Sequence, residues 1–158
     1  MAIPTVSLGG VTVSRLIIGG NPFSGFSHQG VDRDSEMVCY YTADRIKETL
    51  REAEAHGITT FLGRTDRHVT RTLNEYRGEG GKIQWFAQTC PESDSILRSV
   101  EEAEQWGAAA CYIHGGVMDF KIANDDLDDV PGIMKMIRDK GMACGIAGHN
   151  PEGFDWAA

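Results

Sequence analysis

The most constraining feature of this sequence is a pattern in which an amphipathic helix ends at a glycine and a short β-rich run follows at once. The pattern occurs four times along the 158 residues. Parallel strands need a crossover connection, which a helix supplies, so alternating helices and strands predict a parallel sheet. We therefore expect an α/β fold in which residues 1–158 form a single domain.

The four units are located by helix-capping residues, apolar positions and closing glycines. Helices are expected from about Thr42 to His56, from Thr65 or Asp66 to Gly78, from Ser93 or Asp94 to Trp106, and from about Asp129 to Lys140. Their apolar positions recur at helical spacing: Ile46, Leu50 and Ala53; Val69, Leu73 and Tyr76; Ile96, Val100 and Ala103; Ile133 and Ile137. The strands that follow these helices are expected at 58–62, 82–88, 108–114 and 142–147.

Ahead of these units the sequence predicts a hairpin and one further strand. Two β-rich runs, 5–8 and 11–13, flank a Gly-Gly turn, so residues 1–14 are expected to form a β-hairpin and residues 15–158 the β/α units. Residues 15–19 read as the first strand of the sheet. Residues 20–41 are expected to form a long loop, and the chain ends near 151–158, where another helix is expected to begin.

Composition excludes several classes of partner. The formal net charge is -8 and the basic residues are scattered, so nucleic acid is not an expected partner. No basic and apolar leader opens the chain, and no run approaches the roughly 18 apolar residues of a membrane span, so a cytoplasmic protein without membrane contact is expected. The four cysteines form no CxxC pair, and Cys111 and Cys144 lie in apolar runs, where buried thiols are expected.

Candidate functional residues follow the predicted strands, because ligands of parallel α/β folds bind at the carboxyl ends of the strands. These candidates are Asn21, Arg64, Asp66, Gln88, His114 and His149. His114 is the main candidate for chemistry, since two following glycines would let a ligand approach the backbone. A hydrogen-bonded structural role for this histidine is the alternative.

Other strand-end residues also have two interpretations. Asp66 is equally suited to cap a helix, and Arg64 could hold an anionic substrate or pair with a nearby carboxylate. His114 and His149 could share a metal ion with Asp66 or Glu92, although no HxH or HExxH spacing supports it. The remaining histidines are assigned no chemistry: His28, His56 and His68.

Three segments resemble the aldo/keto reductases, a family of (β/α)8 barrels. Residues 8–20 resemble the family's opening hairpin and first strand, with its V-S-x-L-x-x-G pattern, while 57–61 and 112–114 resemble its second and fourth strands. The resemblance implies a partial TIM (β/α)8 barrel, an N-terminal β-hairpin plus about five parallel β/α units. A whole barrel takes about 250 residues. A homo-oligomer or the C-terminal barrel half is therefore expected to cover the open sheet edge.

The family transfers hydride from a nicotinamide cofactor to a carbonyl, using a Tyr proton donor, a Lys, an Asp and a substrate-orienting His. The resemblance carries the His over to His114. Leu62 stands where the Asp is expected, Arg67 or His68 falls near the Tyr, and Thr89 or Cys90 replaces the Lys. NADP or NAD is implied by the resemblance alone, because the family's cofactor phosphate site is built by later strands than those present here.

Three functions remain open. The first is a divergent reductase-like oxidoreductase, or the N-terminal part of one, acting on a small carbonyl or polar substrate at a rim made by the strand-end residues. The second is a metal-assisted lyase or isomerase using His114 and His149. The third is a non-catalytic or truncated barrel fragment. A small-molecule substrate is the expected partner for the first two.

Overall fold

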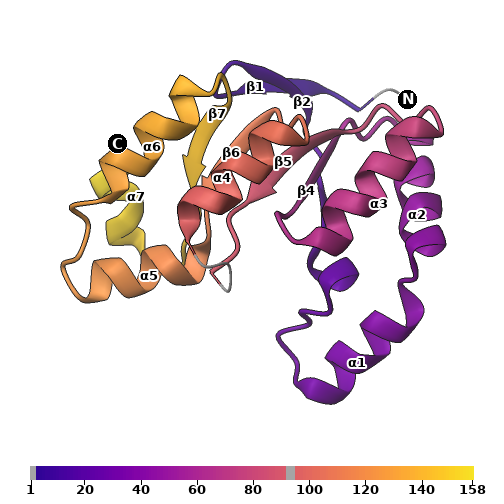
Figure 1. The fold of residues 1–158 in the computed structure, drawn as a ribbon, viewed down its shortest axis with the longest axis horizontal. Helices are drawn as coiled ribbons and strands as arrows, with labels where there is room; N and C mark the ends of the chain where they lie inside the picture. Colours follow the sequence, from indigo (N-terminus) through magenta and orange to yellow (C-terminus); the bar gives the residue numbers. More distant parts are fainter. Residues whose placement is uncertain (1–2, 92–94) are drawn as a thin grey trace.

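A five-stranded parallel sheet is the centre of the molecule, as a computed structural model of residues 3–91 and 95–158 describes it (Figure 1). Strands that are consecutive in the sheet are consecutive in the chain, and every pairing between them is parallel. The order is β3 (Ile18–Gly19), β4 (Thr60–Arg64), β5 (Gln84–Gln88), β6 (Ala110–Ile113) and β7 (Ala143–Ile146). The predicted α/β fold is thereby confirmed.

Four helices of the expected pattern connect the strands: α2 (Ala43–Ala55), α3 (Arg67–Gly78), α4 (Ile96–Gln105) and α6 (Val130–Asp139). The Thr42 and Asp66 side chains accept hydrogen bonds from first-turn amides of α2 and α3, so Asp66 and not Thr65 caps α3. Ser95 caps α4, while Ser93 and Asp94 lie outside the described residues. No helix within 3–91 and 95–158 has the length and apolar character needed to cross a bilayer.

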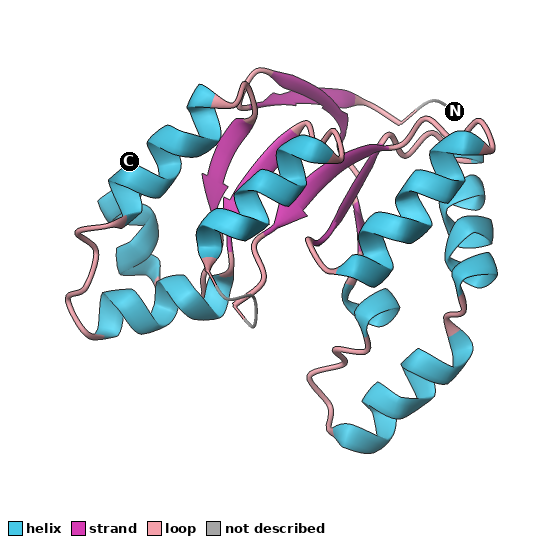
Figure 2. Ribbon diagram, viewed as in Figure 1, coloured by secondary structure: helices cyan, strands magenta, loops and turns pink. Residues whose placement is uncertain are grey.

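The main core lies between these helices and one face of the sheet (Figure 2). Apolar positions predicted on the four helices all belong to this core or pack against it, and Leu50, Val100 and Ile137 have no exposed surface. The strands contribute alternate residues, with Phe61, Trp85 and Cys111 buried on this side. The neighbours of these residues along each strand therefore project from the opposite face of the sheet.

A β-hairpin of β1 (Thr5–Leu8) and β2 (Val11–Ser14) crosses the amino-terminal end of the sheet, as the sequence predicts (Figure 1). Ser14 N donates to Thr59 Oγ1 at 2.9 Å, and Gln84 Nε2 donates to the Thr12 carbonyl at 2.8 Å. Val13 packs in a second, smaller apolar cluster with Phe86 on the other face of the sheet. The hairpin covers the amino-terminal end of the sheet. The opposite end, where the strands have their carboxyl ends, is not covered by the hairpin.

Two segments, 20–41 and 115–123, differ from the sequence prediction. Residues 20–41 are not one loop: they contain a 3-10 turn η1 (Asn21–Ser24) and helix α1 (Val31–Tyr40). Helix α1 buries none of its residues, so it lacks the apolar face by which the other helices are recognised. A helix α5 (Gly115–Ala123), which the sequence did not predict, starts directly after β6. Helix α7 (Pro151–Ala157) follows β7, where the sequence predicts a further helix.

The strands are also shorter than expected at their amino-terminal ends. Only Ile18–Gly19 of the first predicted strand pairs with a neighbour, and β4 begins at Thr60. The cause is local, because Thr59 exchanges hydrogen bonds with Ser14 of the hairpin. The strand β4 instead extends to Arg64, so the direction of that side chain is set by the pleat of the sheet.

Candidate functional site

A cavity of about 380 Å³ lies at the carboxyl ends of the strands. Five of the six residues selected from the sequence line it together: Asn21, Arg64, Gln88, His114 and His149. The sixth, Asp66, faces a neighbouring cavity beside Phe23. The volume is in the lower part of the range of about 300–1,000 Å³ that small-molecule sites occupy.

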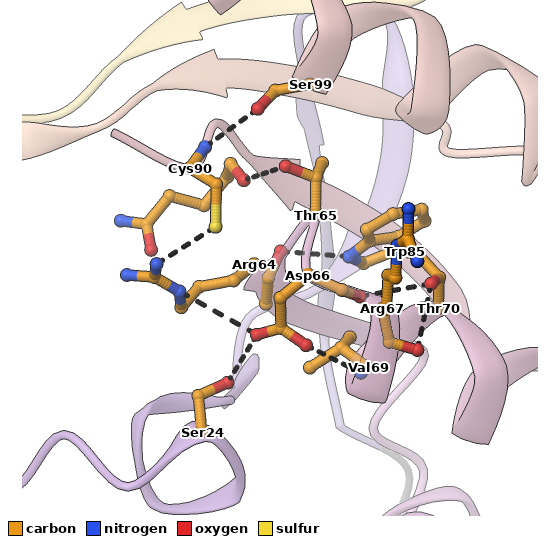
Figure 3. Close-up of polar contacts among 12 residues, drawn as sticks. Ser24, Arg64, Thr65, Asp66, Arg67, Val69, Thr70, Trp85, Cys90 and Ser99 are labelled. Atoms are coloured by element: carbon orange, nitrogen blue, oxygen red, sulfur yellow. Dashed lines mark hydrogen bonds and ion pairs between the residues drawn. The ribbon is translucent and has the colours of Figure 1, made fainter. Parts of the chain in front are cut away.

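Arg64 is the buried cation of the cavity wall, with 7% of its surface exposed. Its Nη2 donates to Cys90 Sγ at 2.9 Å, and its Nε lies 3.7 Å from Asp66 Oδ2 (Figure 3). The guanidinium carbon lies 4.5 Å from the centre of the Phe26 ring. Contacts from three segments thus hold one guanidinium in place. The contact with Asp66 corresponds to one of the two roles that the sequence left open for Arg64.

Asp66 has a structural role that the sequence also suggested. Its Oδ1 accepts from Val69 N at 2.8 Å, which caps α3, and its Oδ2 accepts from Ser24 Oγ at 3.1 Å (Figure 3). The contact with Ser24 ties η1 to the start of α3. Asp66 therefore offsets part of the charge of Arg64 without lining the cavity, whereas Arg64 lines it.

His114 combines the two roles that the sequence left open. It caps α5, because its Nδ1 accepts a hydrogen bond from Gly116 N at 3.1 Å, and its ring also lines the cavity. A ring nitrogen that accepts from an amide carries no proton, so the neutral ring has its proton on Nε2. The glycines after His114 form the first turn of α5 and not a flexible loop, which corrects the sequence interpretation.

His149 is held by Asp119, a residue that the sequence did not single out. Asp119 Oδ2 lies 2.7 Å from His149 Nδ1, while Oδ1 accepts from the backbone amides of His149 at 2.7 Å and Asn150 at 3.1 Å. Hydrogen bonds from the His149 ring and then its amide lower the pKa of the Asp119 carboxyl. An ionised Asp119 fixes the Nδ1–H tautomer, which leaves Nε2 of the neutral ring as a proton acceptor.

The segment after β3 supplies the remaining wall of the cavity. Asn21 Nδ2 lies 3.2 Å from His28 Nε2, and both residues line the cavity with Phe26. His28 has a φ of 57°, in the left-handed region that non-glycine residues rarely adopt. The sequence assigned His28 no chemistry, since its place in an apparent loop gave no indication that it would line the same cavity as His114.

The described residues provide no ligand set for a metal ion. Within 3–91 and 95–158, no three His, Cys, Asp or Glu side chains gather as metal ligands would. Nδ1 of His114 and Nδ1 of His149 each have a hydrogen-bond partner, and Asp66 lies beside Arg64. Glu92, the other acid considered, lies outside the described residues. The metal-assisted alternative stays a prediction without structural support.

Among the described residues that line the cavity, only His114 matches a catalytic group of the reductases that the resemblance implies. No Tyr or Lys is among the described residues that line the cavity, and Leu62, at the position of the family's Asp, packs against the cluster of Val13 and Phe86. Tyr112 projects from the face of the sheet opposite the main core, in register with Gln88, and burial raises the pKa of its hydroxyl. A proton donor for carbonyl reduction needs the opposite shift.

Comparisons with known proteins add no relative. No protein-family model, curated protein or solved structure matches this chain. The resemblance to aldo/keto reductases therefore rests on the three sequence segments alone and stays a prediction. The α/β architecture and the cavity at the carboxyl end of its sheet stand independently of that resemblance.

Proposed function

We propose that this chain is built as the first five β/α units of a (β/α)8-barrel enzyme that transfers a proton on a small 2-oxo acid. The observation that carries the proposal is the Asp119–His149 pair, whose histidine lines the same cavity as Arg64 and His114. An imidazole oriented by a carboxylate is suited to general acid–base chemistry, and a buried cation that lines the same cavity is suited to binding an anionic substrate.

The barrel interpretation is supported by the order of the strands. Each parallel strand lies beside the strand before it in the chain, with helices in every connection, as in (β/α)8 barrels. In doubly wound sheets, by contrast, the order in which successive strands are added to the sheet reverses at a switch point. The hairpin across the amino-terminal end of the sheet agrees with the resemblance, and the cavity is at the end where such barrels bind substrates.

The charges of the described lining residues favour a monoanionic ligand. Arg64 is the buried cation, Asn21 and Gln88 offer neutral amides, and none of the described lining residues is acidic. Asp66, at 3.7 Å from Arg64 Nε, offsets part of the positive charge. A single planar guanidinium with a partly balanced charge is better matched to one carboxylate than to a dianionic phosphate.

The two histidines have complementary protonation for enolisation of a 2-oxo acid. His149 Nε2 takes a proton from the carbon next to the carbonyl, while the electron pair of that C–H bond moves toward the carbonyl oxygen. His114, with its proton on Nε2, donates a hydrogen bond to the developing oxyanion. Arg64 holds the carboxylate, and return of the proton completes an exchange or an isomerisation.

Exchange of substrate protons with solvent tests this function. Wild-type protein in D2O is expected to accelerate loss of the methyl 1H signal of pyruvate or the C3 signal of 2-oxobutyrate in NMR. His149→Gln should slow the exchange about 10²- to 10⁴-fold, the usual contribution of a general base. His56→Gln, on an exposed helix end, is the matched control and should leave the rate unchanged. Equal rates for wild type and His149→Gln would refute the proposal.

The reductase-like oxidoreductase is the second candidate. His114 favours it, because it stands at the end of β6 as the family's substrate-orienting histidine does, and it lines the cavity. Titration with reduced NADP or NAD, followed by nicotinamide fluorescence, separates the two candidates. Cofactor binding without proton exchange supports the reductase, and proton exchange without cofactor supports the acid–base enzyme. Absence of both is expected of a non-catalytic fragment, and equally of a reductase whose cofactor phosphate site is built by later strands.

A further inference from the structure

A second cavity, of about 460 Å³, adjoins the proposed site. The two cavities share three lining residues, Pro91, His114 and Gly116. The shared residues include the histidine proposed to contact the substrate carbonyl. A ligand bound at His114 therefore has space on both sides, toward Arg64 in the first cavity and along α5 in the second.

The wall of the second cavity along α5 is apolar. Val117 and Phe120 are three residues apart on this helix, so they lie on the same face. Phe120 has 64% of its surface exposed, although phenylalanine is among the residue types that are most often buried. An exposed aromatic residue next to the cavity that holds Arg64 offers contact area to the apolar part of a ligand.

The charged residues of the second cavity are balanced against each other. Lys121 Nζ lies 2.7 Å from Asp129 Oδ1 and 3.4 Å from Asp126 Oδ2. These hydrogen bonds, Asp129 first, raise the pKa of Lys121, so the ammonium stays charged and paired. The second cavity therefore attracts apolar surface more than a second anion.

We propose that the two cavities bind two parts of one ligand, a 2-oxo acid with an aromatic or branched apolar side chain. The carboxylate and carbonyl lie with Arg64 and His114, and the side chain lies against Val117 and Phe120. This inference rests on the proposed function, since it places the 2-oxo acid in the first cavity. Contact of one phenyl ring with the apolar wall corresponds to roughly tenfold tighter binding or more.

Calorimetric titration with a matched pair of ligands tests the inference. The probes are 2-oxobutyrate and 2-oxo-4-phenylbutyrate, which differ by one phenyl ring. Wild-type protein is expected to bind the phenyl acid at least tenfold more tightly. Phe120→Ala should remove most of that difference and leave the affinity for 2-oxobutyrate unchanged. Phe154→Ala removes a comparably exposed phenylalanine from α7 and should change neither affinity.

The possible failures are distinguishable from one another. Equal wild-type affinity for the two acids would overturn the apolar subsite. A preference for the phenyl acid that survives in Phe120→Ala would also overturn it. Both results would leave the proposed function intact. Binding of neither acid overturns the proposed function together with the subsite. Thermal unfolding of both variants at the wild-type temperature shows that any loss is not a loss of fold.

Discussion

Replacing Asp119 with Asn tests the arrangement of the Asp119–His149 pair. The substitution keeps the shape of the side chain but replaces one carboxylate oxygen with an NH2 donor. Asp119 Oδ1 accepts two backbone amides, from His149 and Asn150, and an amide oxygen can still accept both. The amide nitrogen of the substituted side chain would then replace Oδ2, which lies 2.7 Å from His149 Nδ1 in the wild type. Because the amide nitrogen is a donor, His149 Nδ1 must become the acceptor. The neutral ring moves its proton to Nε2 and loses its basic nitrogen there.

Two magnitudes follow from this exchange. Catalysis of proton exchange should fall by no more than the about 10²- to 10⁴-fold expected for removal of His149 itself, because Asp119 acts only through that histidine. The free energy of unfolding should fall by about 1–2 kcal/mol at neutral pH, because hydrogen bonds to a charged group are stronger than those to a neutral one. For a chain of this size such a loss lowers Tm by about 2–8 °C.

The pH dependence has a defined sign. The pKa of Asp119 lies below its ordinary value of 3.8 in the folded protein, so its contribution to stability is present above that value. The contribution is lost as the pH falls through the lower folded pKa. The part of the difference in unfolding free energy between wild type and Asp119→Asn that comes from the Asp119 carboxylate should therefore be present at neutral pH and shrink in acid.

Long-range 1H–15N NMR of the imidazole nitrogens at pH 8 reads the tautomer directly, with His149→Gln identifying the His149 signals. Wild type should carry its proton on Nδ1 and Asp119→Asn on Nε2. Retention of the Nδ1–H form in Asp119→Asn, or proton exchange at the wild-type rate, would show that Asp119 does not orient His149.

Further predictions concern glycines and thiols. A Cβ at Gly148 would lie 2.9 Å from Asp119 Oδ1, so Gly148→Ala should displace that carboxylate and lose the Nδ1–H signal of His149. A Cβ at Gly132 of α6 would meet nothing within 4 Å, so Gly132→Ala should raise the unfolding free energy by about 0.5–1 kcal/mol, and a lower Tm would contradict this. In the folded protein a thiol reagent should label exposed Cys39 and not Cys111, which is fully buried and whose pKa burial raises to about 12.

The α/β fold could be predicted because its signals are local. Helices such as α2 and α3 carry an apolar stripe, a capping side chain and a closing glycine, and each of these is readable in a short window. Helix α1 has no buried residue and gives no stripe, so its segment reads as a loop. Helix α5 begins with two glycines capped by His114, and glycine predicts a turn more readily than a helix.

The candidate site was predictable only in part, for the same reason. Residues at strand ends converge by topology, which is why Arg64, Gln88 and His149 line one cavity. Asp119 could not be selected, because its role depends on α5 beginning at Gly115 and on a contact with a residue 30 positions away. The second role of Asp66, its contact with Ser24 of η1, likewise depends on a turn that the sequence does not announce.

Titration of 15N-labelled protein with 2-oxobutyrate tests most directly whether the cavity at the carboxyl ends of the strands is a binding site for small carboxylates. The largest shift changes are expected in the amides of residues that line it, above all Gly115, Gly116 and Gly148, and in the side chain of Arg64. The neutral amide of the same acid should produce much smaller changes. Absence of saturable shifts, or shifts centred on the β1–β2 hairpin at the opposite end of the sheet, would contradict the proposed site.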